Sequence, residues 1–212
     1  MDGEMGLYEA IHSRRDTRSE FTGEPVAGDV LDRLLYAAHS APSVGMSQPW
    51  DFVLVRSSET LKAFREHVAS ERQVFADTLP PDRAATFAGI KVEGIVDSGL
   101  GIVVGYDASR GGRHVLGRHA IDDAGLYSTV CAIQNLWLAA TAEGLGLGWV
   151  SFYREDFLGP LVGLPSHVRP VAWLCLGHVS SRPTVPDLER VGWRGRSSLA
   201  SVVHHEKYRA NR

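Results

Sequence analysis

The chain has few cysteines, little excess charge and no long uninterrupted apolar run. Only two of its 212 residues are cysteine, Cys131 and Cys175, and each lies in an apolar segment. We interpret them as buried free thiols in a reducing compartment, so the expected location is the cytoplasm. The net charge is −3, which argues against a general nucleic-acid binder, because such proteins usually carry a basic excess.

Signals for secretion, membrane insertion and hydrolysis are also lacking. The N-terminus has no basic start followed by an apolar run, so we expect no signal peptide. The longest apolar stretch, 126–142, contains Gln134 and Asn135, and we predict a buried helix there instead of a membrane span. No G-x-S-x-G elbow or Ser/His/Asp order indicates a hydrolase. His204-His205 has no second cluster with ligand spacing, so we predict no metal site.

The order of periodic segments predicts a single α+β domain over residues 1–212. Apolar periodicity predicts helices at 5–14, 29–39, 60–74, 121–143 and 156–162. Apolar runs predict strands at 51–56, 101–106, 149–153 and 171–177. Helices and strands do not alternate strictly, which argues against a doubly wound sheet. Helix 121–143 is apolar around most of its circumference, and in a domain of this size a subunit interface would bury it most easily, so we expect a homodimer.

Three segments lie outside this framework of helices and strands. Residues 76–94 contain Pro80-Pro81 and a weakly amphipathic run, and residues 108–118 are polar and rich in glycine. We take both as candidate lids over a binding site. The tail, 183–212, is polar and contains proline, and we expect it to pack on the partner subunit.

A short cluster of charge stands out near the N-terminus. Arg14-Arg15-Asp16-Thr17-Arg18 places three arginines around one carboxylate. Planar guanidinium groups bind phosphate well, so the arginines predict a phosphate clamp. A bound phosphate would repel Asp16, so this acid would need a task of its own, such as holding sugar hydroxyls or moving a proton. The alternative is a solvated charge run at a helix end.

Three other segments have the composition of a ligand site. Residues 41–50 form a loop stiffened by two prolines, with hydrogen-bonding groups on Ser43, Ser47 and Gln48; the alternative is a capped helix end followed by a rigid turn. Residues 143–151 place three glycines between a helix and a strand, where bare backbone N–H groups and Ser151 could face a planar ligand, or where the helix simply ends. Arg194 and Arg196 could complete a phosphate site or lie in a solvated tail.

Together these motifs resemble the flavin-dependent nitroreductase fold family. The matching motifs fall in family order: Arg14-Arg15-x-x-Arg18, Pro42-Ser43, Ser47-Gln48-Pro49-Trp50, Glu143-Gly144-Leu145-Gly146 and Arg194-x-Arg196. The resemblance implies a central mixed or antiparallel sheet flanked by helices, with the long buried helix at a homodimer interface. It also implies FMN bound at that interface by residues of both chains. The FMN-binding residues would be Arg14, Arg15, Asp16, Thr17, Arg18, Pro42, Ser43, Ser47, Gln48, Gly146, Leu147, Trp149, Ser151, Arg194 and Arg196.

Within the family, the chain is most similar to a branch that consumes reduced FMN as a substrate. The signals are Asp16, where ordinary nitroreductases usually have serine, and the segments 41–45, 110–117, 127–137 and 148–151. This similarity implies O2-dependent fragmentation of reduced FMN to 5,6-dimethylbenzimidazole and D-erythrose 4-phosphate, in the biosynthesis of cobalamin (vitamin B12). A separate NAD(P)H-dependent flavin reductase would supply the reduced FMN.

The same similarity implies that Asp16 and Ser151 are the catalytic residues. Asp16 would act as a base or orient a ribityl hydroxyl, and Ser151 would bond near the N5/C4a region of the flavin. The neighbouring arginines should lower the pKa of Asp16 and keep it ionised. Met46-Ser47 departs from the usual family residues and puts a small polar group near the flavin edge. The alternatives are an NAD(P)H-dependent FMN nitroreductase or flavin reductase, and a non-catalytic flavin-binding protein.

Overall fold

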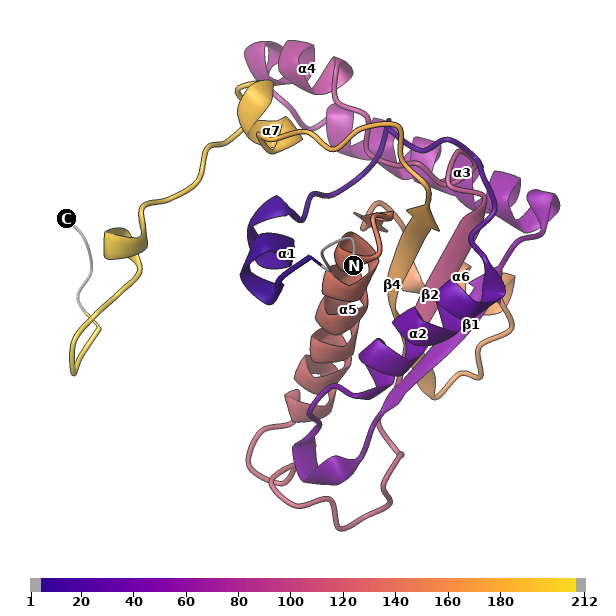
Figure 1. The fold of residues 1–212 in the computed structure, drawn as a ribbon, viewed down its shortest axis with the longest axis vertical. Coiled ribbons are helices and arrows are strands. Elements are labelled where there is room, and N and C mark those ends of the chain that lie inside the picture. The colour runs from indigo at the N-terminus through magenta and orange to yellow at the C-terminus, as the bar shows by residue number, and fades with distance from the viewer. Residues whose placement is uncertain (1–4, 209–212) are drawn as a thin grey trace.

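An antiparallel sheet forms the centre of the computed structural model, which describes residues 5–208 (Figure 1). Its four strands within that range are β1 (Trp50–Val55), β2 (Leu100–Asp107), β3 (Gly146–Val150) and β4 (Val168–Gly177), in the order β1-β2-β4-β3. All neighbouring pairs are antiparallel, so the predicted α+β class is confirmed. The ends of the predicted domain 1–212 and of the extension 183–212, residues 1–4 and 209–212, lie outside the described range.

Helices cover both faces of the sheet. They are α1 (Leu7–Ser13), α2 (Gly28–His39), α3 (Ser58–Ala76), α4 (Pro81–Ala88), α5 (Ala124–Ala142), α6 (Glu155–Leu161) and α7 (Asp187–Arg190), with short 3-10 turns η1 (Val44–Met46) and η2 (Leu199–Ser201). The predicted helices are all present, and α4 lies inside the candidate lid 76–94. Helix α3 begins where the Ser57 hydroxyl accepts the N–H of Thr60. Helix α5 ends where Gly144 adopts a φ of +77°.

One predicted strand begins three residues earlier than expected. The glycines at 146 and 148 are part of β3, where they pair with Gly177 and Cys175 of β4, and the strand ends at Val150. The prediction of a strand over 149–153 was therefore wrong at both ends. Glycine has weak strand preference, but pairing with a buried neighbouring strand overrides it.

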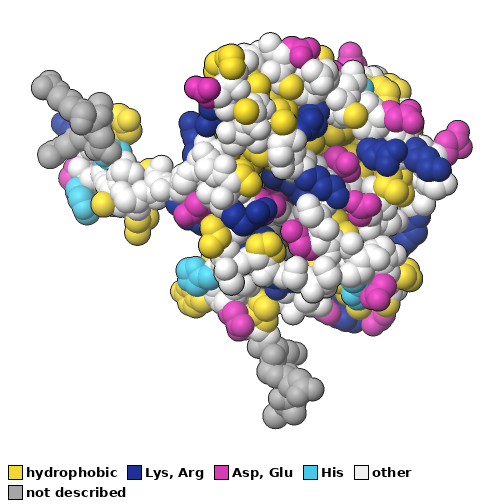
Figure 2. Space-filling model, turned by 90° about the horizontal axis from the view of Figure 1, so that it is seen from above, with side chains coloured by type: hydrophobic (Ala, Val, Ile, Leu, Met, Phe, Trp, Pro, Cys, Tyr) yellow, Lys and Arg dark blue, Asp and Glu magenta, His cyan; other side chains and the backbone are white. Residues whose placement is uncertain are grey.

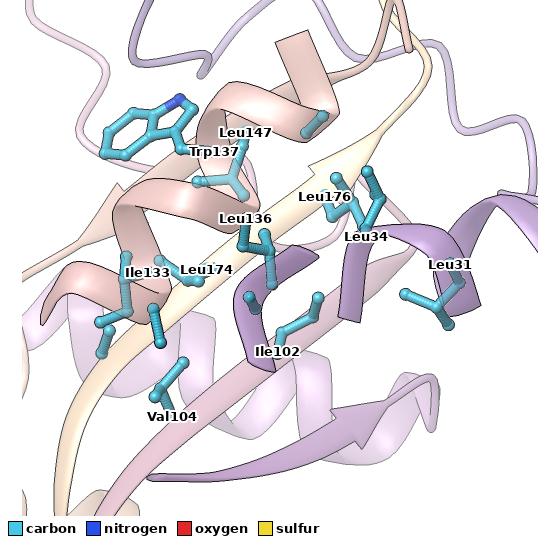
Figure 3. Close-up of a cluster of buried hydrophobic side chains, with 14 of the residues drawn as sticks. Leu31, Leu34, Ile102, Val104, Ile133, Leu136, Trp137, Leu147, Leu174 and Leu176 are labelled. Carbon is cyan, nitrogen blue, oxygen red and sulfur yellow. The ribbon is translucent and has the colours of Figure 1, made fainter. Parts of the chain in front are cut away.

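Alternation along the central strands divides the core in two. On β4, Ala172, Leu174 and Leu176 face the helices α2 and α5, while Trp173 and Cys175 face α3 and α6. Strand β2 alternates in the same way. Successive side chains of a strand point to opposite faces, so an apolar run of this kind predicts a sheet covered on both sides. Figure 3 shows the first of these clusters, where Leu136 of α5 and Leu34 of α2 pack over Ile102.

Helix α5 buries one side and leaves an apolar stripe uncovered. Ile133 and Leu136 are fully buried, but Tyr127 is 57% exposed, and Val130 and Cys131 are also exposed. These three positions follow the i, i+3, i+4 spacing of a single helix face. The prediction of two buried thiols holds for Cys175 and is wrong for Cys131 in the single chain, because that thiol lies on this stripe.

The last part of the tail, after residue 196, leaves the body of the molecule. Figure 1 shows it extending away from the sheet, with η2 far from the other elements. Its apolar side chains Leu199, Val202 and Tyr208 are exposed. In the part of the chain that the structure describes, no helix is both long and apolar enough to traverse a bilayer.

Candidate functional site

The charged segment after α1 lies along strand β3. Asp16 forms a parallel bridge with Leu147, and the N–H of Thr17 donates to the carbonyl of Leu147 at 3.0 Å. The N–H of Trp149 donates to Oδ1 of Asp16 at 2.9 Å. The structure therefore brings together two segments, 14–18 and 146–149, that the sequence marked separately as parts of one site.

The glycines of β3 make this close approach possible. A Cβ added to Gly148 would collide with the carbonyl oxygen of Thr17, and a Cβ added to Gly146 would press on the Thr17 side chain at 2.9 Å. The sequence left open whether these glycines present N–H groups to a planar ligand or simply end a helix. In the structure, Gly146 and Gly148 let the segment of Asp16 and Thr17 approach β3, where that segment binds the carbonyl of Leu147 and the N–H of Trp149. Leu147 and Thr17 are themselves buried.

Asp16 sits at the junction of this segment with a polar pocket. One carboxylate oxygen accepts the Trp149 N–H, and the other forms an ion pair with Arg18, while 30% of the side chain is exposed. Burial raises the pKa of Asp16 above its ordinary value, although Arg18, the Trp149 N–H and Arg14 pull it down. The arginines do act in the expected direction, but the expected net lowering of the Asp16 pKa was wrong, because the loss of hydration outweighs them.

Asp16 and four arginines line a cavity of about 150 Å³. Residues 183 and 185–188 of the tail form the opposite wall; the full lining is Arg14, Arg15, Asp16, Arg18, Pro183, Val185, Pro186, Asp187, Leu188 and Arg196. Figure 2 looks onto this end of the molecule and shows basic side chains gathered near the middle of the face, with acidic ones among them. Arg196 lies where the sequence predicted it. Arg194 does not line the cavity, so the predicted pair of late arginines is separated.

The four arginines of the cavity have different partners. Arg15 donates to the carbonyl oxygens of His12, Arg14 and Thr184, so it fastens the tail to the segment after α1. Arg18 is paired with Asp16. The guanidinium of Arg14 lies 4.6 Å from the centre of the Trp137 ring.

Arg14 and Arg196 are the cavity's arginines whose side chains form no hydrogen bond or ion pair among the described residues. Burial, and then repulsion from Arg15 and Arg196, lowers the pKa of Arg14, although Asp16 opposes the shift. Excess positive charge without acceptors is the condition under which an anion binds well. These residues therefore fit the phosphate of FMN, and Arg14 and Arg196 are the ones free to hold it.

The loop after α2 forms a second cluster, and its backbone is strained. Gly45, Met46 and Gln48 have φ values of +52°, +54° and +44°, and the last two are not glycine. Such strain often marks a ligand-binding segment. The Ser43 hydroxyl accepts the N–H of Gln48 at 3.0 Å, and Pro42 is exposed at the start of the loop.

Ser47 lies in the same loop with an unsatisfied hydroxyl. Its side chain is only 6% exposed, and its Oγ has no hydrogen-bond partner in the described part of the chain. A buried polar atom without a partner is costly, so this hydroxyl fits a polar group supplied by a ligand. Met46, next to it, is 81% exposed.

The candidate lid 108–118 packs against this loop. A Cβ on Gly45 would lie 2.7 Å from the backbone nitrogen of Leu116, and one on Gly111 would meet Ser47 at 3.1 Å. Arg110 ties the lid to β1 by donating to the Trp50 carbonyl at 2.8 Å and to both oxygens of Asp51 at 2.7 Å. Leu116 is 83% exposed at the tip. The two loops form one unit, which the sequence did not predict.

Ser151 is not where we expected it. We predicted that it lies just inside the strand, facing a ligand on the glycines, but it follows the end of β3 and borders a hollow with Phe75 and Phe152. It does not line the arginine cavity. Ser151 is two residues beyond Trp149, which places it about 7 Å along the chain from the amide that binds Asp16.

The two clusters meet α5 at opposite faces. The N–H of Val44 donates to the Ser128 hydroxyl at 3.0 Å, and the indole of Trp137 donates to the Arg15 carbonyl at 3.2 Å. Nine residues separate these contacts, which is about 14 Å along the axis and about half a turn around it. One chain therefore does not unite the arginine cavity with the loop cluster.

Sequence reasoning missed two parts of the cavity. Trp137 carries Arg14 and the Arg15 carbonyl, and the segment 183–188 forms a wall. In the sequence, Trp137 resembles the other apolar residues of the predicted buried helix. The tail segment carries no motif, and only its contact with Arg15 places it at the site.

Comparisons with known proteins agree on one family. A family model described as the Nitroreductase family matches residues 11–178. The chain is 36% identical over 195 residues to a protein named 5,6-dimethylbenzimidazole synthase from Rhodospirillum rubrum, covering 90% of each chain. It is 35% identical over 192 residues to one of the same name from Rhodobacter capsulatus, covering 89% of this chain and 90% of that one.

A solved structure shows the same fold. The crystal structure of oxidized iodotyrosine deiodinase bound to FMN and 3-iodo-L-tyrosine matches with a TM-score of 0.75 and 18% identity, covering 96% of this chain and 100% of that chain. An identity of 18% shows a shared fold and nothing about a shared function. The family model spans most of the chain, and two relatives exceed 30% identity over nine-tenths of it. On these grounds, and with the fold that it shares, this chain belongs to the nitroreductase family.

Proposed function

We propose that the protein catalyses the O2-dependent fragmentation of reduced FMN to 5,6-dimethylbenzimidazole and D-erythrose 4-phosphate. The observation that carries the proposal is Asp16, a carboxyl group fixed by the Trp149 N–H and Arg18 in the wall of an arginine-lined cavity. An enzyme that only passes electrons through FMN has no evident use for such an acid. The relatives named 5,6-dimethylbenzimidazole synthase support the same assignment.

Asp16 would hold or move a proton at the ribityl chain. Its carboxylate is oriented by two donors, and its raised pKa brings it closer to the range in which a group exchanges protons efficiently near neutral pH. When bound, reduced FMN would supply the electrons for dioxygen and the carbon atoms of the product. Ser151 would hold a polar group of the ring system, beyond the end of β3.

Arg14 and Arg196 would bind the phosphate group. Arg14 is free of hydrogen-bond acceptors and is held over the Trp137 ring, so its donors face the cavity without a competing partner. Arg15 and Arg18 would act through the tail and through Asp16, respectively. The phosphate stays on the departing sugar, so the same two arginines would hold one end of the substrate throughout the reaction.

The full site would be completed across a homodimer. The arginine cavity and the loop cluster lie on opposite faces of α5, and the exposed stripe of Tyr127, Val130 and Cys131 lies on the side of that helix between these two faces. A two-fold interface along this stripe would set the loops of one chain against the cavity of the other. Exposed Met46 and Leu116 would then exclude water from the ring system. The projecting tail would cover the partner subunit.

A single incubation tests the proposed function. Purified protein, photoreduced FMN and air would be combined, and the products separated by chromatography. We expect a peak of dimethylbenzimidazole with a matching loss of FMN. Full recovery of intact FMN would refute the proposal. Consumption of NAD(P)H by the protein alone would then indicate a flavin reductase, and its absence a flavin-binding protein.

A further inference from the structure

A cluster of aromatic rings joins α4 to the C-terminal tail. Phe87 of α4 lies 5.0 Å from Phe75 at the end of α3, 6.1 Å from Phe152 after β3, and 5.9 Å from Trp193 after α7, measured between ring centres. The rings come from four segments that are distant in the sequence. A shift of one segment would therefore displace the rings of the other three.

Arg83 fastens α4 to Trp193 by two contacts. Its guanidinium carbon lies 3.6 Å from the centre of the indole ring, and its Nη1 donates to the Trp193 carbonyl at 3.1 Å. A cation over an indole face is the strongest form of cation–π contact. The other end of α4 is held by Arg72, which donates to the carbonyls of Phe87, Ala88 and Ile90. Helix α4 is thus held at both ends.

The clamp of Arg83 on Trp193 reaches the arginine cavity through the tail. The N–H of Trp193 donates to the Leu188 carbonyl at 2.8 Å, and Leu188 lines the cavity. Arg196, three residues further on, lines it too. On the other side of the cluster, Phe152 directly follows Ser151, and both border the same hollow. Figure 1 shows α4 and α7 side by side at this end of the molecule.

We propose that Arg83 and Trp193 are positioning residues that keep reduced FMN on the path to product. By holding α4 against the tail, they fix the cavity wall that carries Arg196 and the segment that carries Ser151. When the wall is loose, reduced FMN would give two electrons and two protons to dioxygen, which yields oxidised FMN and hydrogen peroxide without fragmentation. This inference rests on the proposed function. It adds the contacts that favour fragmentation of reduced FMN over its reoxidation by dioxygen.

The test compares Arg83→Met with Arg65→Met. Both replacements remove one positive charge, but Arg65 is an exposed residue of α3 whose side chain forms no hydrogen bond or ion pair among the described residues. Two quantities would be measured in air with photoreduced FMN: dimethylbenzimidazole formed and hydrogen peroxide released, per FMN consumed or reoxidised. For Arg83→Met we expect the ratio of product to peroxide to fall about fivefold, which corresponds to about 1 kcal/mol, while FMN affinity falls by a smaller factor because Arg14 still holds the phosphate. Arg65→Met should behave as the wild type.

Hydrogen exchange provides a readout that does not depend on turnover. Amide exchange in α4 and in residues 193–196 should speed up about fivefold in Arg83→Met and in Trp193→Leu, but not in Arg65→Met. Trp193→Phe keeps a ring and should lie between these variants and the wild type. The effect of the double variant should be smaller than the sum of the two single effects, because either replacement removes the contact of Arg83 with the Trp193 ring.

Each result decides the inference. Unchanged exchange in α4, or faster exchange with a wild-type product ratio, would overturn it. A matching loss of thermal stability and FMN affinity in Arg83→Met would show a merely structural role and overturn it as well. Wild-type protein that yields only peroxide and oxidised FMN would refute the proposed function, and the exchange measurement would still decide whether the clamp exists.

Discussion

The arginine cavity and the loop cluster are built in opposite ways. At the cavity, Asp16 is held by the distant Trp149 N–H and by Arg18, and Arg15 binds the tail, so that Arg14 and Arg196 are left free. At the loop cluster, the backbone is strained, the Ser47 hydroxyl has no partner, and Met46 and Leu116 are exposed. A single chain therefore assembles the polar half of the site, the arginine cavity, but leaves the apolar half, the loop cluster, exposed to solvent.

The largest expected effect follows from replacing Asp16, the acid of the arginine cavity. Asp16→Asn keeps the size of the side chain and an oxygen for the Trp149 N–H, but it removes the proton acceptor. Formation of dimethylbenzimidazole should fall about a hundredfold or more, while FMN binding is retained. Chromatography of the products and quenching of flavin fluorescence would measure the two. Near wild-type product formation would disprove the acid–base role.

Mixing two defective variants tests whether the arginine cavity and the loop cluster of one site come from different chains. Gly45→Ala should disable the loops, because φ is +52° and the new Cβ would lie 2.7 Å from the backbone nitrogen of Leu116. Subunit exchange between Asp16→Asn and Gly45→Ala should restore about a quarter of wild-type activity, because half of the dimers are mixed and each has one intact site.

Each variant exchanged with itself is the control for that experiment, and it should stay inactive. A mixture that gains nothing, although mixed dimers are shown to form, would place both clusters in a site within one chain.

The division of labour among the arginines can be tested with the phosphate itself. Arg14→Met or Arg196→Met should weaken FMN binding between about 10- and 150-fold, because each removes a charged hydrogen-bond donor. Binding of riboflavin, which has no phosphate, should hardly change. Arg194→Met is the matched control, since Arg194 does not line the cavity. Equal losses for Arg194→Met would contradict the assignment.

A glycine substitution probes how tightly the charged segment, residues 14–18, packs on β3. Gly148→Ala would drive a Cβ into the Thr17 carbonyl and push the charged segment away from β3. We expect a loss of about 1–3 kcal/mol in the free energy of unfolding, measured by urea denaturation. Gly159→Ala in α6 meets no atom within 4 Å, so it should be neutral or stabilising. Similar losses at both sites would argue against close packing at Gly148.

The smallest effect concerns pH. Because burial raises the pKa of Asp16, the folded state holds its proton more tightly than the unfolded state. The stability of the wild type relative to Asp16→Asn should therefore fall as the pH rises from about 4 through the raised pKa, by at most about 1.4 kcal/mol per pH unit. Thermal melts of both proteins over this range would measure it. A relative stability that rises with pH would show that the arginines prevail.

Much of the site was predictable because its chemistry is local. Arg14, Asp16 and Arg18 fall within five residues, and the loop of Ser43 and Ser47 is equally short. Ser151 was misplaced because the strand boundary near glycines is poorly fixed by propensity. The role of Gly146 and Gly148 stayed open because a glycine that meets a ligand and one that meets another segment of the chain look alike in a sequence.

The sequence by itself determined most of the helices and strands, the α+β class, and which residue types could hold a phosphate and move a proton. These follow from periodicity and side-chain chemistry, which act over a few neighbouring residues. Only the tertiary structure decided which arginines are free, that Trp149 orients Asp16, and that burial raises the pKa of that carboxyl. Burial and pairing depend on groups more than a hundred residues apart, such as Asp16 with Trp149 and Arg15 with Thr184, and only the folded chain brings them together.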